Sequence, residues 1–222
     1  MHKKTLKSCD WSTGDALMQR YHDQEWGVPV REDRKQFEFL VLEGAQAGLS
    51  WRTILHKREA YRVAYAQFDP EIVARFSSRD VKRLLTSLGI IPPPAAGRRS
   101  RPGSRSDQAF GLAAGGGIIR NRLKIEWSIK NAQNFLKLQE EFGTFTDYIW
   151  RFVHGTPKRN AWKLLKQLPA TSPESDALSR DLKQRGFSFV GSTIMYAHMQ
   201  AAGLVNDHLV GCFRHMEVTK GK

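Results

Sequence analysis

The sequence is poor in cysteine and in acidic residues, and it has no long apolar run. Two cysteines among 222 residues cannot build the disulfide framework of a small secreted protein, so we expect reduced thiols, either inert or bound to a metal. No run approaches the roughly 18 apolar residues of a membrane-spanning helix, and the basic start lacks the apolar core of a signal peptide. These absences predict an intracellular protein without a membrane partner, in the cytoplasm (nucleoid) of a bacterium or in the nucleus or an organelle of a eukaryote.

Basic residues dominate the charge of the chain. The 35 Lys and Arg outnumber the 22 Asp and Glu, which gives a net charge of +13 and a pI near 10.0. This balance predicts a polyanionic partner. With 41% hydrophobic and 26% charged residues, the composition is typical of a globular protein and argues against disorder, collagen or a coiled coil. We expect one domain over residues 1–222, with flexible tails at 1–8 and 214–222.

The spacing of apolar residues predicts an all-α fold. Apolar residues recur at helical spacing along the chain, and no stretch shows sustained alternation with period two. Apolar stripes predict helices over 81–88 and 125–136. Two further helices, 175–184 and 190–202, are predicted to end before Gly186 and Gly203, because glycine commonly closes a helix in a left-handed conformation.

One segment does not fit a helical core. From Pro92 to Gly117, half of the residues are Pro, Gly or Ser, and four arginines stand against one aspartate. Such a composition predicts a disordered insertion, here within a hairpin between two helices. The tripeptide Gly-Ile-Ile lies just before it, at 89–91, and recurs at 117–119. We interpret the segment either as a tolerated loop or as a translated non-coding stretch.

Both cysteines belong to a candidate metal site. Cys9 and His22 lie near the start of the chain, whereas His208 and Cys212 lie four residues apart near its end and would share a face if that segment is helical. Two Cys and two His form a common donor set of structural zinc sites, and such a site would join the two chain ends. The spacing is not a generic zinc-finger pattern, so four unrelated side chains remain the alternative on spacing alone.

Glu43 is the most informative acidic residue. It lies in a segment, 37–47, that is apolar on almost every side of a helix, and at 100° per residue it falls between Phe39 and Ala47. We therefore expect a buried carboxylate that needs a partner or a shifted pKa, and we expect Glu38 on a more tolerant side. The alternative to a functional role is a structural carboxylate satisfied by an arginine or by a helix N-terminus.

Four aromatic residues cluster in the same N-terminal third of the chain. Singly, each is typical of a core. Together with a buried carboxylate they would suit a pocket that stacks a flat, electron-poor ring, such as a nucleobase, and binds its edge. These residues are Trp11, Tyr21, Trp26 and Trp51.

Two glycine turns are candidates for contact with DNA. Gly48-Leu49 is predicted to end the buried helix, and Ser50 to cap the next helix. After the insertion, the chain reads Gly117-Ile118-Ile119-Arg120-Asn121-Arg122 and enters another helix, with Lys124 in its first turn. Backbone N–H groups and the helix dipole at such a turn can hold a phosphate, which would give a sequence-independent DNA clamp. A plain connection between helices is the alternative.

Several motifs together resemble the 3-methyladenine DNA glycosylase I family. They read CDW at 9–11, YHDQEWGVP at 21–29, LEGAQAGLSW at 42–51, KQRGFSFV at 183–190 and GLVNDH at 203–208. The resemblance extends from about Cys9 to Cys212, with only Pro92 to Gly117 unmatched. It implies an all-α fold of the helix-hairpin-helix DNA glycosylase type, with a zinc-binding addition that joins the N- and C-terminal segments.

The resemblance also assigns roles to residues. It implies that Glu43 recognises a flipped 3-methyladenine as the catalytic residue, and that structural Zn²⁺ is bound by Cys9, His22, His208 and Cys212. The expected base-binding residues are Tyr21, Trp51, Trp11 and Trp26. The expected DNA-binding residues are Gly48, Leu49, Gly117, Ile118, Arg120, Asn121 and Arg122.

The implied activity is hydrolysis of the N-glycosidic bond of 3-methyladenine by base flipping, the first step of base-excision repair. The expected partner is double-stranded DNA with alkylated bases, and the expected state is a monomer. No lysine nucleophile for strand cleavage is evident, so the enzyme would be monofunctional. A non-catalytic helix-hairpin-helix DNA-binding protein, impaired by the insertion, and a glycosylase for another damaged base are the alternatives.

Overall fold

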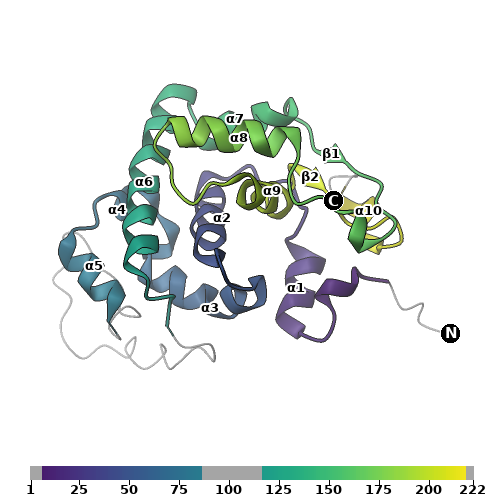
Figure 1. Cartoon of the computed structure of the whole chain (residues 1–222), viewed down its shortest axis with the longest axis horizontal. Coiled ribbons are helices and arrows are strands. Elements are labelled where there is room, and N and C mark those ends of the chain that lie inside the picture. The colour runs from purple at the N-terminus through teal and green to yellow at the C-terminus, as the bar shows by residue number, and fades with distance from the viewer. Residues whose placement is uncertain (1–6, 87–116, 219–222) are drawn as a thin grey trace.

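A computed structural model describes residues 7–86 and 117–218 (Figure 1). The predicted insertion, apart from Gly117, lies outside the described residues, as does most of the predicted N-terminal tail. The described chain is mostly helical, as predicted. Its α-helices are α1 (Ala16–Gln24), α2 (Asp33–Gln46), α3 (Trp51–Ala64), α4 (Pro70–Ala74), α5 (Ser78–Leu85), α6 (Arg122–Phe142), α7 (Phe145–Trp150), α8 (Pro173–Gln184), α9 (Ser192–Ala201) and α10 (Phe213–Glu217).

Strand structure is minimal in the described residues. Two strands of two residues each, β1 (Lys158–Arg159) and β2 (Val205–Asn206), pair in parallel. This pair links the loop after α7 to the segment after α9. No helix in the ranges 7–86 and 117–218 is both long enough and apolar enough to cross a membrane.

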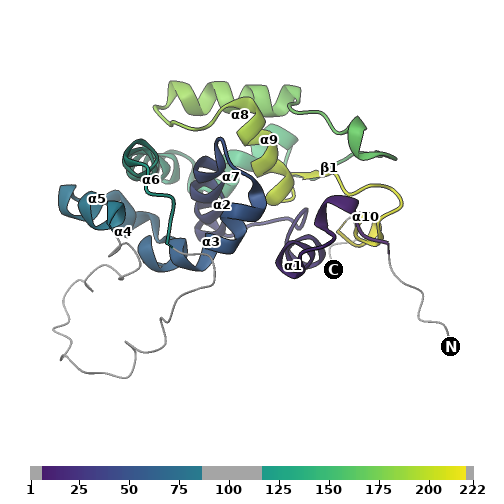
Figure 2. The same ribbon diagram turned by 60° about the horizontal axis from the view of Figure 1, so that its bottom comes forward.

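Helix α2 is the centre of the fold. Its neighbours are α3, α6, α7 and α9, and both ribbon views show it enclosed by them (Figures 1 and 2). Phe37, Phe39 and Leu42 have no exposed surface, as expected for a helix that is apolar on all sides. The carboxyl end of α2, which carries Glu43, is therefore held in the interior.

The helix ends follow the predicted local chemistry. Ser50 caps α3, because its Oγ accepts a hydrogen bond from the Thr53 N–H over 3.2 Å. Gly186 and Gly203, after α8 and α9, have φ angles of 82° and 70°, which confirms their predicted left-handed conformation. At Gly203 a Cβ atom would lie 2.4 Å from the carbonyl carbon of Val28, so no other residue fits there without displacing the backbone.

Some predicted boundaries need correction. The helix predicted over 81–88 begins earlier, at Ser78, and ends at Leu85, and the helix predicted over 190–202 begins at Ser192. Part of the tail predicted over 214–222 is helical instead, because α10 spans Phe213–Glu217 and buries the side chains of Arg214 and His215, and residues 219–222 lie outside the described residues.

The two ends of the described chain meet. The backbone N–H of Phe213 donates to the carbonyl of Lys7 over 3.0 Å. Both ribbon views place α1 and α10 at the same end of the molecule (Figures 1 and 2). This arrangement brings the N-terminal and C-terminal motifs together.

Candidate functional site

A pocket lies where α1, α2, α3 and α9 converge. Its volume of about 340 Å³ falls within the range of roughly 300–1,000 Å³ that is usual for ligand sites. The structure brings Glu43 and all four predicted base-binding residues together in its wall. The lining residues are Trp11, Met18, Tyr21, Trp26, Glu43, Gln46, Trp51, Leu168, Ala197 and Gln200.

Sequence reasoning missed several of these lining residues. Gln46 follows Glu43 by three residues on α2, so helical spacing alone could have placed it on the same face. Leu168, Ala197 and Gln200 come from segments more than 100 residues away, and no local pattern connects them to α2. Only the tertiary fold reveals their contribution.

The Glu43 carboxylate is buried without a neutralising partner. Its side chain is 4% exposed, and within residues 7–86 and 117–218 no hydrogen bond or ion pair satisfies it. Burial alone raises its pKa to about 8. The structure therefore does not support the alternative in which an arginine satisfies this carboxylate.

Glu38, on the same helix, has the opposite environment. It was expected on a tolerant side of α2, but it is only 3% exposed. Arg58 Nε donates to it over 2.7 Å, Lys35 over 3.0 Å and Arg62 over 3.1 Å. Although burial opposes ionisation, these hydrogen bonds and positive charges, chiefly those of Arg58, lower its pKa. Glu38 is thus a neutralised structural carboxylate, and it contributes nothing to the pocket lining.

Aromatic rings form much of the remaining wall. The rings of Tyr21 and Trp51 are 5.2 Å apart and tilted by 47°, and those of Trp11 and Trp26 meet edge to face at 5.0 Å. Burial raises the pKa of Tyr21 well above its ordinary value, and the charge of Glu43 adds to this effect. The buried indole N–H of Trp51 has no acceptor among the described residues, so it is available as a donor.

The turn between α2 and α3 borders the pocket. Gly48 has a φ angle of 79°, and its Cβ position is open, so the backbone conformation and not crowding within the protein favours glycine here. Leu49 is 40% exposed, which is unusual for a large apolar side chain. Gln46 and Trp51, on either side of the turn, both line the pocket. An exposed apolar residue therefore stands beside the pocket.

The segment from Gly117 to Ile119 is anchored to α3. The carbonyl of Gly117 accepts a hydrogen bond from Lys57 Nζ over 2.9 Å, and the Ile119 N–H donates to the Tyr61 hydroxyl over 3.2 Å. Ile118 is only 5% exposed, so its side chain belongs to the core. Of the residues predicted to bind DNA, Ile118 could contribute only its backbone.

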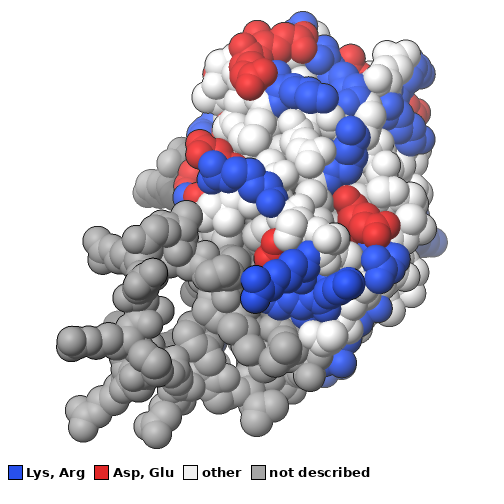
Figure 3. All heavy atoms as spheres, turned by 90° about the vertical axis from the view of Figure 1, so that its left-hand side faces the viewer, with Lys and Arg blue, Asp and Glu red and all other residues white. Residues whose placement is uncertain are grey.

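The following residues face outward. Arg120, Asn121 and Arg122 are exposed, and Arg122 contacts Glu126 over 3.1 Å. The Asn121 side chain caps α6 by accepting from the Lys124 N–H over 3.1 Å, so its role is local structure. The side of the molecule that carries α4, α5 and α6 exposes more basic than acidic side chains (Figure 3), and Arg75, Arg79 and Lys82 are exposed residues of this region.

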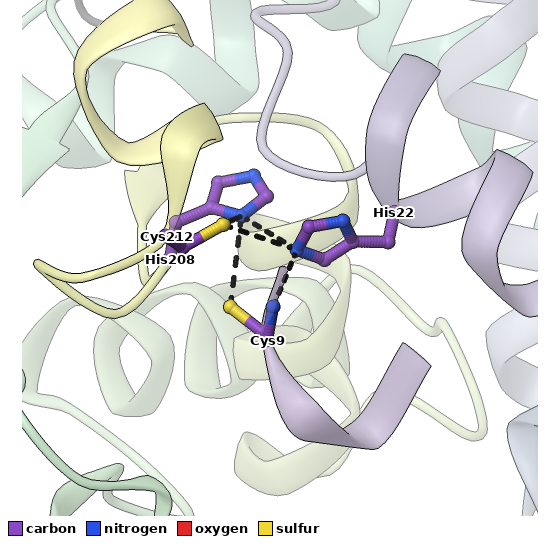
Figure 4. A group of neighbouring side chains, drawn as sticks. All are labelled: Cys9, His22, His208 and Cys212. Atoms are coloured by element: carbon purple, nitrogen blue, oxygen red, sulfur yellow. Dashed lines mark hydrogen bonds between the residues drawn. The ribbon is translucent and has the colours of Figure 1, made fainter. Parts of the chain in front are cut away.

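A second site lies at the meeting of the chain ends. Cys9, His22, His208 and Cys212 are all buried, and their potential ligand atoms lie within 4.8 Å of one another (Figure 4). Cys9 precedes a short 3₁₀ helix, His22 lies on α1, and His208 and Cys212 lie in the non-helical segment between β2 and α10. The fold thus unites all four predicted ligands.

The histidine rings are oriented for metal binding. His22 Nδ1 lies 2.6 Å from a carboxylate oxygen of Asp23, and His208 Nε2 lies 2.9 Å from the carbonyl of Trp26. These outer contacts leave His22 Nε2 and His208 Nδ1 facing each other over 3.2 Å, with the Cys212 sulfur 3.4 Å from the former. Outer hydrogen bonds of this kind are typical of metal-binding imidazoles.

A hydrogen bond between the two thiols shifts their pKa values in opposite directions. The hydrogen bond with Cys9, helped by those with His208 and His22, holds the pKa of the Cys212 thiol far below its ordinary value. The same hydrogen bond, together with burial, raises the pKa of Cys9. One sulfur therefore carries negative charge readily. Two sulfur and two nitrogen donors in a closed, buried cluster fit a tetrahedral zinc ion.

Known proteins are similar to this chain in sequence and fold. The sequence model of a family described as "Methyladenine glycosylase" matches residues 11–94 and 105–215, and the break between the two ranges lies inside the predicted insertion. The chain is 42% identical to DNA-3-methyladenine glycosylase 1 of Escherichia coli (strain K12), over 93% of this chain and 96% of the relative.

Solved structures agree with this likeness. A crystal structure of 3-methyladenine DNA glycosylase I has a TM-score of 0.78 and 44% identity, covering 93% of this chain and 98% of the other. The Staphylococcus aureus enzyme, solved to show the structural basis of 3-methyladenine recognition, has a TM-score of 0.78 and 33% identity, with coverage of 94% and 96%. The chain belongs to the 3-methyladenine DNA glycosylase I family.

Proposed function

We propose that the protein is a monofunctional glycosylase that hydrolyses the N-glycosidic bond of 3-methyladenine in alkylated double-stranded DNA. The observation that carries this proposal is the environment of Glu43, a buried carboxylate without a partner in an aromatic pocket. The relatives named for this activity match nearly the whole chain.

The charge of the substrate explains why such a carboxylate is useful. Methylation at N3 places a positive charge on adenine, and the base leaves deoxyribose as a neutral molecule, so little acid catalysis is required. A cationic base can neutralise Glu43 and lie against the rings of Tyr21 and Trp51. An unmodified base offers no charge, so Glu43, with a pKa of about 8, would stay largely protonated against it and make no ion pair. The pocket would thereby discriminate by charge.

Base flipping would bring the base to Glu43. The glycosidic bond cannot be reached inside a duplex, so glycosylases extrude their target base into a pocket. The exposed Leu49 on the turn after α2 stands beside the pocket, where it would occupy the space that the base leaves. Gly48, with an open Cβ position, lets the backbone of this turn approach the DNA closely.

The N-terminus of α6 would hold the DNA backbone. The first N–H groups of a helix have no acceptor within the helix, and the positive end of the helix dipole favours a phosphate. Arg120 and Arg122, both exposed, add positive charge at this point. Helices α5 and α6 contact each other. They would form the two arms of the helix-hairpin-helix.

A structural Zn²⁺ would be held by Cys9, His22, His208 and Cys212. The metal would cross-link Cys9 and α1 to the segment between β2 and α10. His22 directly follows Tyr21 on α1, and Trp26 packs against His208 with ring centroids 4.6 Å apart. The metal would therefore support the pocket wall from outside without touching the base.

Base release from methylated duplex DNA tests this proposal. We expect chromatography of the products to show free 3-methyladenine and little 7-methylguanine, and free 3-methyladenine added to the reaction to inhibit it. If folded, zinc-loaded protein binds the DNA but releases no base, the protein is a DNA-binding module without turnover. If another base is released instead, the pocket has a different substrate.

A further inference from the structure

We propose that Lys124 is a positioning residue that fixes the turn between α2 and α3 against the start of α6, and that it does not bind a phosphate. The inference rests on the proposed function, because it concerns how the base pocket is aligned with the N-terminus of α6, which is proposed to hold the DNA backbone. By its place in the sequence, Lys124 is grouped with Arg120 and Arg122 as a basic residue next to a phosphate turn. The structure separates it from them.

The ammonium group of Lys124 points into the protein. Its Nζ donates to the carbonyl of Ala45 over 2.8 Å and to that of Ala47 over 2.6 Å. Two of its three N–H donors are thus committed to backbone acceptors. The side chain is half-buried, and burial lowers its pKa. Arg120 and Arg122, in contrast, are exposed.

These carbonyls belong to the carboxyl end of α2. The last carbonyls of a helix lack partners within the helix, and a cation there gains from the negative end of the helix dipole. Ala45 and Ala47 lie between Glu43 and the turn formed by Gly48 and Leu49. One ammonium group therefore provides hydrogen bonds to two carbonyls in the segment that joins Glu43 to the turn beside the pocket.

Two further contacts hold the segment before α6 against α3, the helix that follows this turn. Lys57 and Tyr61, both on α3, hold the backbone of Gly117 and Ile119 through the hydrogen bonds described above. The segment before α6 is thus held against α3, while Lys124 ties the first turn of α6 to the end of α2. A flipped base can reach Glu43 in the right position only if the phosphate site at the start of α6 and this turn keep a fixed separation. Misplacement of a reacting group by about 1 Å can lower the rate 100-fold.

The substitution Lys124→Met tests this role, because methionine keeps an unbranched apolar stem and removes the ammonium group. Lys130→Met is the matched control, since Lys130 is an exposed residue on α6 outside the site. Arg122→Met represents loss of a phosphate contact. For each variant we would measure the salt dependence of DNA binding, the affinity for free 3-methyladenine and the single-turnover excision rate at saturating protein.

For Lys124→Met we expect excision to fall roughly 10- to 100-fold, while the affinity for free 3-methyladenine and the salt slope stay at the wild-type values. Arg122→Met should instead weaken DNA binding and lower its salt slope by about one. If Lys124→Met lowers the salt slope of DNA binding as Arg122→Met does, or excises the base at the wild-type rate, the inference is wrong.

Amide hydrogen exchange keeps this test independent of catalysis. In the absence of DNA, Lys124→Met should exchange the amides of residues 46–50 at least tenfold faster than wild type and Lys130→Met, with the rest of α2 unchanged. Unchanged exchange at 46–50, or faster exchange throughout α2, would overturn the positioning role. A wild-type protein that releases no base would refute the proposed function and leave this comparison intact.

Discussion

Glu38 and Glu43 lie five residues apart on the same buried helix and have opposite electrostatic environments. Glu38 contacts Arg58, Lys35 and Arg62, whereas Glu43 has no cation beside it among the described residues. A protein interior rarely leaves a carboxylate unpaired, because the desolvation cost is high. Glu43, the unpaired carboxylate, faces the pocket. A positively charged group would therefore be stabilised where the base is proposed to bind.

Because Glu43 is buried, we expect this residue to lower the stability of the folded protein at neutral pH. Its pKa is about 8 in the folded protein, against an ordinary value of 4.5. The unfolded chain releases this proton above pH 4.5 while the folded protein retains it up to about pH 8, so stability is lost across that window as the pH rises. Glu43→Gln should therefore raise the free energy of unfolding by at most about 3 kcal/mol at pH 7 and by little at pH 4. Urea denaturation at both pH values measures this difference, and an equal effect at both would contradict it.

Ionisation of Glu43 should also appear in the pH dependence of the reaction. The profile of kcat/KM reports the free enzyme, so we expect it to rise with pH through a midpoint near 8. The profile of kcat reports the enzyme–substrate complex, in which the cationic base stabilises the carboxylate, and its midpoint should be lower. Initial rates between pH 6 and 9.5 give both profiles. Two flat profiles over this range would show that Glu43 ionisation is irrelevant to the reaction.

Arg58 should be essential for stability. It donates two hydrogen bonds to Glu25, over 2.7 and 2.8 Å, and a third to Glu38. Arg58→Met leaves the buried Glu38 and the half-buried Glu25 undercompensated, and the loss should be about 3–5 kcal/mol at pH 7. Because Arg58 and its neighbours lower the pKa values of Glu25 and Glu38, the stabilisation should be present at neutral pH and fade as the pH falls through the folded pKa values, which for Glu25 is about 2. Arg62→Met, at a more exposed position, is the control and should cost much less in the same denaturation experiment.

Local patterns in the sequence were sufficient for much of this fold. The all-helical character, the Ser50 cap and the glycine ends of α8 and α9 depend on neighbouring residues, and the structure agrees with each. The burial of Glu43 followed from a helix that is apolar on every side. The environment of Glu38 did not follow, because Arg58 and Arg62 lie on α3, and helical spacing says nothing about which residues another helix presents.

The site shows the same division. The four metal-binding candidates could be grouped by residue type, but their approach to within 4.8 Å depends on contacts between residues about 200 positions apart. Lys124 lies among exposed basic residues in the sequence, and only the fold shows that it binds backbone carbonyls. Likewise, Leu168 and Gln200 reach the pocket through tertiary packing alone.

Removal of the proposed zinc ion should destabilise the protein as a whole. Cys212→Ser should abolish binding of one equivalent of zinc and lower the melting temperature by about 10 °C, because the two chain ends lose their cross-link. Metal analysis and calorimetry measure the two effects, and a chelator should reproduce the second in the wild-type protein. His56→Gln, at an exposed histidine far from the cluster in sequence, should retain the metal. A Cys212→Ser protein with full zinc content would contradict the proposal that Cys212 binds zinc.

The central claim is that the Glu43 carboxylate recognises a cationic base, and the most direct test compares single-turnover release of 3-methyladenine by wild type and by Glu43→Gln. Glutamine keeps the size and shape of the side chain and removes its charge. We expect the variant to remain folded, to bind unmethylated duplex DNA as tightly as wild type does and to lose most of its excision activity. A folded Glu43→Gln variant that releases 3-methyladenine at the wild-type rate would contradict the account.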